Sequence, residues 1–304
     1  MMVGEQCFSA QIADLHFTFQ CQDSRIFLDR QGSIQAYCID GDVENSDYLF
    51  SYAVRSVIDL FDYQLTFRGE PISNDFLNYS WYVYTLGEKV AIRVEFKDHS
   101  EIKSVLAEFE KGKTQVKISL VLKTDCHKAV RLDPLMHPLG SLLMLYLVQE
   151  KQGLLIHASA IEDGGQGILF TGVSGIGKST MARLWGECGA CVLNDDRLVL
   201  RLFDREVRLY NNPMPYYKQA PKQSILKKIF LLKQSPLNYI QPLKGVQAYS
   251  RVLGNFIQQF YEPAMVKKHL DIAEEIIAKV AVYEVGFKPD TDIVRMMREM
   301  DRYE

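Results

Sequence analysis

The chain has 304 residues, of which 47% are hydrophobic and 24% are charged, and its formal net charge is −3. This length suggests two domains, and the balanced charge gives no electrostatic support for nucleic-acid binding as the main function. The first ten residues lack the basic and apolar regions of a signal peptide, and the apolar run 139–148 is too short to span a bilayer. We therefore predict a cytoplasmic protein that binds neither nucleic acid nor a membrane.

Residues 1–136 are predicted to form a β-rich domain of unknown role. Hydrophobic and polar side chains alternate with the two-residue period of half-buried strands in three segments, 15–20, 90–97 and 116–123. Glycine-containing turns at 86–89 and 110–113 bound these segments. Because short turns join consecutive strands, we expect antiparallel pairing in this domain.

Residues 137–304 are predicted to form an α/β domain with a mixed sheet and flanking helices, so the whole chain is α/β (α+β). Pro138 suits the first turn of an apolar helix that would end at Gly153. A strand at 154–161 and a strand before residue 172 should form a hairpin, because only a tight Gly-Gly turn separates them. The remaining expected elements are a helix at 178–188, a strand at 191–193, a hairpin around 204–205, a strand from 224, a helix at 263–280, a strand at 281–287 and a helix from about 290.

Residues 172–179 match the pattern G-x-x-x-x-G-K-[ST] between a predicted strand and a predicted helix. Backbone N–H groups of such a loop converge on phosphate oxygens, and the following helix adds its partial positive charge. Lys178 should reach the β- and γ-phosphates, and the Ser179 hydroxyl should contact Mg²⁺. The candidate nucleotide-binding residues are Gly172, Val173, Ser174, Gly175, Ile176, Gly177, Lys178, Ser179 and Thr180, the last as a helix residue. The motif alone does not distinguish a kinase from an ATPase, a GTPase or a binding-only site.

Two adjacent carboxylates, Asp195 and Asp196, follow the loop after only fifteen intervening residues beyond Ser179. That spacing leaves room for one helix, one turn and one short strand, so the carboxylates should lie close to the loop. A phosphotransferase needs such groups to hold a metal ion and to orient the accepting hydroxyl. The alternative is a solvated acidic turn. Between the loop and the two aspartates, Cys188 and Cys191 form an isolated C-x-x-C. We interpret it as two cysteines packed around a turn at Gly189, since a second metal-ligand pair is missing.

His157 lies in the predicted strand before the loop. A single histidine in an apolar strand is more often a hydrogen-bonded core residue than a catalyst. Here, however, the neighbours Ala158, Ser159 and Ala160 are small and leave space near the imidazole. The expected hairpin would also bring this strand beside the one that leads into the loop.

Together, the segments "LIHASAI", "GILFTGVSGIGKSTMARL" and "LNDDRLVLR" resemble the C-terminal catalytic domain of HPr serine kinase/phosphorylase. They resemble more closely the HPr-kinase-like proteins encoded in bacterial peptide-modification and polysaccharide gene clusters. This group belongs to the phosphoenolpyruvate-carboxykinase-like branch of P-loop proteins. The strong resemblance covers residues 154–201, and a weaker one continues to the end of the chain.

The resemblance implies a kinase that uses Mg²⁺ and ATP, or another nucleoside triphosphate, to phosphorylate a hydroxyl. The acceptor would be a serine of a peptide or protein, or a small hydroxyl compound. It also implies roles for individual residues: Asp195 on the magnesium side, Asp196 as the base, His157 as the upstream histidine, and Arg197 at phosphate. HPr kinases form oligomers, so the resemblance allows for a homo-oligomer.

The sequence departs from true HPr kinases because the glycine-rich signature after the second strand pair is missing. Reverse phosphorylase activity and HPr itself as the acceptor are therefore not implied. Arg251 is a candidate for the later active-site arginine. The polar loop 211–223, with Tyr216, Tyr217, Lys218 and Lys222, is either a lid over the substrate or a solvated connector. Two other functions stay open: a nucleotide-binding regulatory or scaffold protein without transfer activity, and a carboxykinase-like metabolic enzyme, for which metal ligands and anion-binding arginines are too few.

Overall fold

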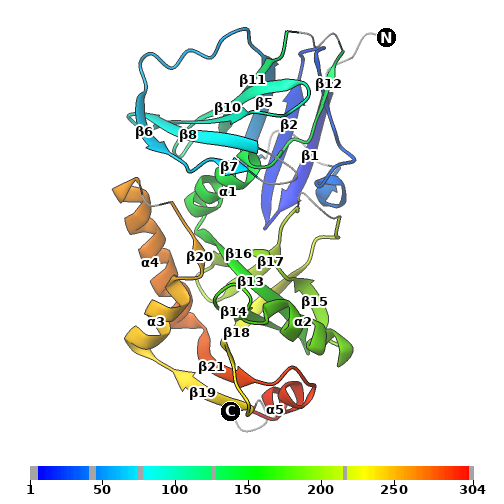
Figure 1. Cartoon of the computed structure of the whole chain (residues 1–304), viewed down its shortest axis with the longest axis vertical. Coiled ribbons are helices and arrows are strands. Elements are labelled where there is room, and N and C mark those ends of the chain that lie inside the picture. The colour runs from blue at the N-terminus through cyan, green and yellow to red at the C-terminus, as the bar shows by residue number, and fades with distance from the viewer. Residues whose placement is uncertain are drawn as a thin grey trace. The chain divides into compact units, whose positions relative to one another are not determined.

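The computed structural model describes residues 6–40, 46–73, 78–124, 128–214, 218–259 and 261–300. The chain is a mixed α/β protein that divides into two compact units (Figure 1). The first unit comprises residues 1–146 and 213–220, and the second comprises 147–212 and 221–304. No helix in the described part of the chain has both the length and the apolar character needed to cross a membrane.

The first unit is built on a ten-stranded sheet in the order β4-β1-β2-β5-β11-β10-β9-β8-β6, with β7 paired to β8. A second, two-stranded sheet pairs β12 with β3, and a 3₁₀ helix covers Gln35–Tyr37. The strands are β1 (Gln6–Ile12), β2 (Leu15–Cys21), β3 (Ile26–Leu28), β4 (Cys38–Ile39), β5 (Tyr48–Val54), β6 (Gln64–Arg68), β7 (Ile72–Ser73), β8 (Asn78–Leu86), β9 (Lys89–Phe96), β10 (Ile102–Glu110), β11 (Gln115–Leu122) and β12 (Val130–Leu132).

The three segments with two-residue periodicity are strands, and β8 to β11 pair antiparallel. The predicted turns at 86–89 and 110–113 join β8 to β9 and β10 to β11. The expectation of antiparallel pairing is wrong for β5, which pairs parallel with both β2 and β11. The physical reason is the connection: β5 follows β2 after a long excursion through β3 and β4, so no short turn dictates its direction.

Helix α1 (Leu139–Glu150) leads from the first unit into the second. It ends before Gly153, contrary to expectation, and Gln152 takes the left-handed conformation with φ 57°. Gly153 is instead the first residue of a strand, where a Cβ atom would lie 2.5 Å from the Val148 side chain. The glycine is therefore required by close packing at the strand start, and the helix terminates without it.

The second unit contains a strongly bent nine-stranded sheet in the order β14-β13-β16-β17-β18-β21-β19, with β15 and β20 also paired to β13. An additional pairing of β14 with β18 closes β14, β13, β16, β17 and β18 into a ring. The strands are β13 (Gly153–Asp163), β14 (Gln166–Thr171), β15 (Cys191–Asn194), β16 (Arg197–Leu202), β17 (Val207–Asn211), β18 (Gln223–Gln234), β19 (Tyr239–Leu243), β20 (Phe256–Ile257) and β21 (Ala281–Phe287). The helices are α2 (Lys178–Glu187), α3 (Gly245–Leu253), α4 (Pro263–Lys279) and α5 (Asp292–Met300).

Two hydrophobic cores lie on opposite sides of β14, β18 and β21, because successive strand residues face opposite ways. The first, which we call the aliphatic core, joins Leu169, Ile229 and Val282 to α3 and α4. The second, which we call the aromatic core, joins Phe170, Phe230, Tyr283 and Phe287 to α2 and α5. Figure 1 shows α3 and α4 on one side of these strands and α2 and α5 on the other.

The last helix is tied to the end of α2 by one arginine. The guanidinium of Arg298 donates two hydrogen bonds to the Asp163 carboxylate, at 2.9 and 2.7 Å, and a third to the Cys188 carbonyl at 3.1 Å. It also lies over the Trp185 ring, with 5.2 Å between the guanidinium carbon and the ring centroid. These contacts fix α5 against the C-terminal end of α2 and the end of β13, beside the aromatic core.

Candidate functional site

The loop between β14 and α2, residues 172–177, is referred to below as the glycine loop. Gly175 has φ 77° and Gly177 has φ 112°, a region that residues with a side chain rarely adopt. A Cβ atom on Gly175 would meet open space, whereas one on Gly177 would lie 2.7 Å from the Phe287 ring. The backbone thus turns sharply from strand to helix, and α2 begins directly at Lys178.

Lys178 folds back over the glycine loop. Its ammonium donates hydrogen bonds to the carbonyls of Gly172 at 3.0 Å and Val173 at 3.3 Å, and the residue is only 7% exposed. Burial lowers the pKa of Lys178, while the nearby charge of Asp196 acts in the opposite direction. The ammonium is therefore held at the mouth of the loop by neutral oxygen atoms.

Two hydroxyl groups fix the strand β13 against this loop. The Ser159 hydroxyl donates to the Lys178 carbonyl at 2.8 Å, and the Thr171 hydroxyl donates to the His157 carbonyl at 3.1 Å. Both hydroxyl-bearing residues are fully buried. Ser159 shows that this side of β13 faces α2, and since side chains alternate, His157 faces the same way. Sequence reasoning had noticed only that Ser159 is small.

A charged group forms where β13 meets β16. His157 and Arg197 are directly opposite each other in the antiparallel ladder, so their side chains share one side. The Asp196 carboxylate lies between them, with one oxygen 3.7 Å from His157 Nε2 and the other 3.8 Å from Arg197 Nε. The structure thus brings together four of the predicted residues, and we call His157, Lys178, Asp196 and Arg197 the charged group.

Electrostatics keep the imidazole of His157 neutral. Partial burial lowers its pKa below the usual 6.5, and the positive charges of Lys178 and Arg197 lower it further. The Asp196 carboxylate raises the pKa but does not reverse the shift. At neutral pH the ring therefore offers one acceptor nitrogen and one donor N–H.

Asn194 positions the two aspartates, a role that the sequence did not reveal. This residue is 3% exposed; its side-chain amide donates to the Arg197 carbonyl at 2.6 Å, and its side-chain oxygen accepts from the Asp195 backbone N–H at 2.9 Å. The Asp196 carbonyl in turn accepts from the Ala158 N–H at 3.0 Å. The Asn194 side chain bonds to the backbone of Asp195 and of Arg197, and Asn is common in turns for this reason, so the preference of Asn for turns was the available clue.

The remaining predicted residues of the loop and of the turn after β15 differ in their exposure. Val173, Ser174, Ser179 and Asp195 are exposed, Ile176 and Thr180 are half-buried, and Thr180 belongs to the first turn of α2 as expected. The chemistry of Ser179 and Asp195 fits Mg²⁺, because this ion prefers hydroxyl and carboxylate oxygens and retains waters and phosphate oxygens around it. Within the described residues, no group of three or more His, Cys, Asp or Glu side chains could hold a metal ion.

Other residues singled out in the sequence lie elsewhere. Arg251, on α3, pairs with Glu284 at 2.7 Å, and the Tyr239 hydroxyl donates to the same carboxylate. Lys222 donates to the Val192 carbonyl, and Lys218 belongs to the first unit, where it donates to Gln35 at 2.9 Å. Tyr216 and Tyr217 lie outside the described residues.

The C-x-x-C segment is a turn with free thiols. Gly189 has φ 90°, and its N–H and that of Cys188 bond back to carbonyls of α2. Cys188 packs against the aromatic core as expected. The expectation that both cysteines are packed is wrong for Cys191, which is exposed at the start of β15 because its side chain points away from that core.

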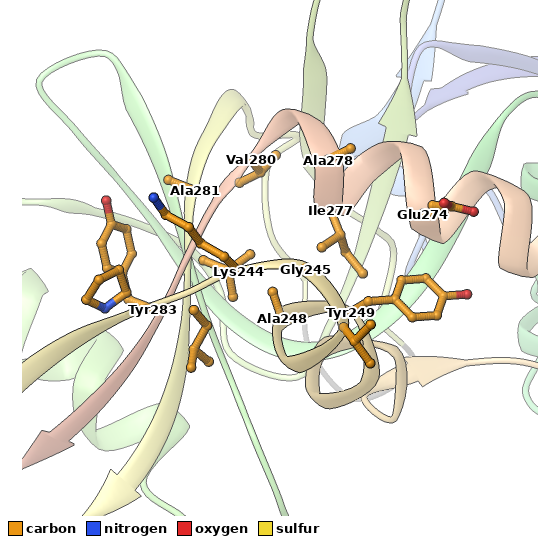
Figure 2. Close-up of a pocket in the computed structure, with 14 residues that line it drawn as sticks. Lys244, Gly245, Ala248, Tyr249, Glu274, Ile277, Ala278, Val280, Ala281 and Tyr283 are labelled. Carbon is orange, nitrogen blue, oxygen red and sulfur yellow. The ribbon is translucent and has the colours of Figure 1, made fainter.

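Two of the cavities formed by the described residues belong to the second unit. One, of about 540 Å³, is lined by Gly175, Ile176, Gly177, Thr180, Gln234, Ser235, Pro236, Phe287 and Pro289, and so adjoins the glycine loop. The other, of about 570 Å³, lies between α3, α4 and β21 and contains none of the predicted site residues. Figure 2 shows that this second cavity is mainly apolar, with Lys244 and Glu274 toward opposite ends.

Comparisons with known proteins find similar chains among the solved structures. No protein-family model matches the chain, and no curated protein matches it. Among solved structures, the chain is similar to the Hpr(Ser) kinase/phosphatase from Coxiella burnetii, with 14% sequence identity and a TM-score of 0.30. The similarity covers 49% of this chain and 98% of that chain.

Proposed function

We propose that the protein is a Mg²⁺- and nucleotide-dependent phosphotransferase that phosphorylates a hydroxyl group. The observation that carries this proposal is the charged group at the glycine loop: Lys178 over the loop carbonyls, and Asp196 between His157 and Arg197. A cation and a loop of backbone N–H groups suit the transferred phosphoryl group, and a carboxylate beside them suits the hydroxyl that attacks it.

In this proposal the chain's own residues bind the phosphates, orient the reacting groups and accept a proton. The glycine loop and Lys178 bind the phosphates, with Lys178 exchanging its two carbonyl partners for phosphate oxygens. The oxygen of the attacking hydroxyl forms the new bond to phosphorus while the bond from phosphorus to the leaving nucleoside diphosphate breaks. Asp196 accepts the proton that this hydroxyl loses. Arg197 stabilises negative charge that spreads over the phosphoryl oxygens.

His157 and Asn194 have positioning roles in this scheme. The neutral His157 ring lies 3.7 Å from one oxygen of Asp196 and orients that carboxylate beside the glycine loop. Asn194 fixes the turn on which Asp195 and Asp196 stand. Ser179 and Asp195 would hold Mg²⁺, which neutralises developing charge on the phosphates when bound.

The test is nucleotide binding and transfer by the full chain, measured separately. Lys178→Ala should lose affinity for Mg·ATP in calorimetry. Asp196→Asn should retain that affinity within about twofold but transfer the γ-phosphoryl group of radiolabelled ATP about 10²–10⁴ times more slowly to a panel of serine peptides and small hydroxyl compounds. Asp271→Asn is a matched control, because Asp271 is an exposed residue of α4 paired with Lys267.

Unchanged transfer by Asp196→Asn would contradict the role of Asp196. Nucleotide binding without transfer to any acceptor by the unmodified chain would instead favour a nucleotide-binding regulatory or scaffold protein. Phosphoryl transfer to a serine peptide would identify a peptide or protein as the acceptor class, and transfer only to small compounds would identify a metabolic kinase.

A further inference from the structure

We infer that the cavity between α3, α4 and the start of β21 is a binding site for a short apolar peptide whose two ends carry opposite charges. This inference goes beyond the proposed function, because the cavity is lined by no residue of the glycine loop or of the charged group. Its walls are the end of β19, the start of α3, the last turns of α4 and the start of β21 (Figure 2). Its volume of about 570 Å³ falls within the range of small-ligand sites, about 300–1,000 Å³.

This cavity and the glycine loop lie at opposite edges of the sheet. Strands β14, β18 and β21 are parallel neighbours, so the glycine loop after β14 and Phe287 at the end of β21 lie at one edge. The cavity is lined by the first three residues of β21, 281–283. Val282 and Phe287 are five positions apart, which is roughly 16 Å of extended strand. A ligand in this cavity therefore does not compete with phosphates on the loop.

The middle of the cavity is apolar because the aliphatic core reaches the surface there. Five lining residues belong to that core: Leu243, Ala248, Ile277, Val280 and Val282. At the rim, Val246 is 82% exposed, and Ala278 and Ala281 are exposed as well. Covering apolar surface that is open to water is favourable, so an apolar ligand would extend the core outward.

Two opposite charges mark the ends of the cavity. Figure 2 shows Lys244 toward one end, and Glu274 and the Tyr249 hydroxyl toward the other. Within the part of the chain that the structure describes, neither Lys244 nor Glu274 makes an ion pair or a side-chain hydrogen bond. Burial and the charge of Glu274 raise the pKa of Tyr249, so its hydroxyl stays protonated. Both charges are therefore available to a ligand.

A short peptide with free termini has the same order of groups. Its carboxylate would pair with Lys244 and its ammonium with Glu274, while its apolar side chains cover the core residues between them. A fatty acid would pair with Lys244 alone and would place its apolar chain against the Glu274 carboxylate, which disfavours it. The reversed direction of the peptide would bring like charges together, so the two ends also fix its orientation.

The test uses the full chain and trileucine as the probe, with binding measured by calorimetry. N-acetyltrileucine amide has the same side chains without the two end charges, and triglycine has the charges without the apolar side chains. An exposed ion pair changes affinity about threefold, so the blocked peptide should bind about tenfold more weakly than trileucine. Triglycine should bind at least tenfold more weakly, because it leaves the apolar surface uncovered.

Substitutions in the cavity give the matched comparisons. Ala278→Trp fills the cavity and should weaken trileucine binding at least tenfold, whereas Glu275→Trp adds the same side chain at a neighbouring exposed position outside the cavity and should change it less than twofold. Glu274→Gln should weaken trileucine binding about threefold and leave N-acetyltrileucine binding unchanged. Glu275→Gln removes the adjacent carboxylate and should change neither.

Equal affinity of the unmodified chain for trileucine and its blocked form would overturn the inference, whether or not the variants fold. Failure of trileucine to bind would overturn it too, as would tighter binding of octanoate, which would favour a fatty-acid site. The proposed function is tested apart from this site, because Lys178→Ala should bind trileucine as the unmodified chain does while losing Mg·ATP.

Discussion

Burial lowers the pKa of two histidines of the second unit, but neighbouring charges act on only one of them, and this marks the difference between the two sides of its sheet. His157 is half-exposed on the side of α2; partial burial lowers its pKa most, and the charges of Lys178 and Arg197 lower it further. His269, on α4, is 4% exposed and contacts the Phe256 ring, and burial alone lowers its pKa to about 4.

The comparison separates chemistry from stability. On the α2 side, charges converge at the end of the aromatic core, where a ligand can reach them. On the α4 side, an imidazole is enclosed by apolar groups, and its Nε2 has no hydrogen-bond partner among the described residues. Titration of the first histidine should therefore change the site, and titration of the second should change the free energy of unfolding.

The largest expected effect tests the α4 side of the comparison, where His269 should make the free energy of unfolding depend on pH. Because the folded pKa of His269 is about 4 and the unfolded value is about 6.5, the unfolded chain takes up a proton first as the pH falls. The stabilisation is complete above pH 6.5 and is lost progressively down to pH 4, by about 3 kcal/mol. His269→Leu should lack this loss.

Urea unfolding followed by Trp185 fluorescence in a Trp81→Phe background measures the second unit, since Trp185 belongs to the aromatic core and Trp81 to β8 of the first unit. If the free energy of unfolding depends on pH in the same way with and without His269, folding does not lower the pKa of this imidazole. His269 would then not differ from His157 in the way we describe.

The second prediction concerns Gly177, whose loop joins the two sides. Gly177→Ala should destabilise the second unit by about 2 kcal/mol, because both the φ of 112° and the contact with Phe287 oppose a methyl group. Gly175→Ala is the matched control, since its φ is also positive but its Cβ would meet open space. Equal losses in the two variants, in the same fluorescence measurement, would show that packing against Phe287 is unimportant.

The elements that could be predicted from the sequence are those set by patterns within a single segment. The glycine loop, the 263–280 helix and the alternating strands follow from motifs and periods within single segments, and the structure contains each of those elements. Sequence reasoning did not find the parallel pairing of β5, because strand partners far apart in the chain are set by the whole sheet. The short elements α3 and β20 were missed for a similar reason, since a few residues carry too little periodicity.

The site divides in the same way. Lys178, Asp196, Arg197 and His157 were singled out by type and spacing, and the structure brings them together. Asn194 was not assigned a role, because its two hydrogen bonds depend on the local turn geometry. The cavity at Phe287 could not be predicted either, since it depends on which strand ends are neighbours at the sheet edge.

The third prediction tests Asn194. Asn194→Ala should slow phosphoryl transfer about tenfold, or about 1.4 kcal/mol, with little change in nucleotide affinity, because the turn that carries Asp195 and Asp196 loses its two side-chain bonds. Asn255→Ala is the control, since its side chain only donates to the Arg251 carbonyl at the end of α3. A rise in KM without a fall in kcat would contradict a positioning role for Asn194.

The smallest effect is a pair of opposite shifts in the titration of His157. Arg197→Gln removes a positive charge that lowers the pKa of His157, so the pKa should rise toward its usual value. Asp196→Asn removes the negative charge that raises this pKa, so the pKa should fall further. Both can be followed by NMR titration of the imidazole, with the signal assigned by its loss in His157→Gln.

The two substitutions change residues on either side of the His157 ring. A change in fold would shift the pKa of His157 in the same direction in both variants, whereas direct electrostatic contact shifts it in opposite directions. Opposite shifts would therefore establish that Asp196 and Arg197 act on His157 in solution as they do in the structure, and shifts of equal sign would separate His157 from the charged group.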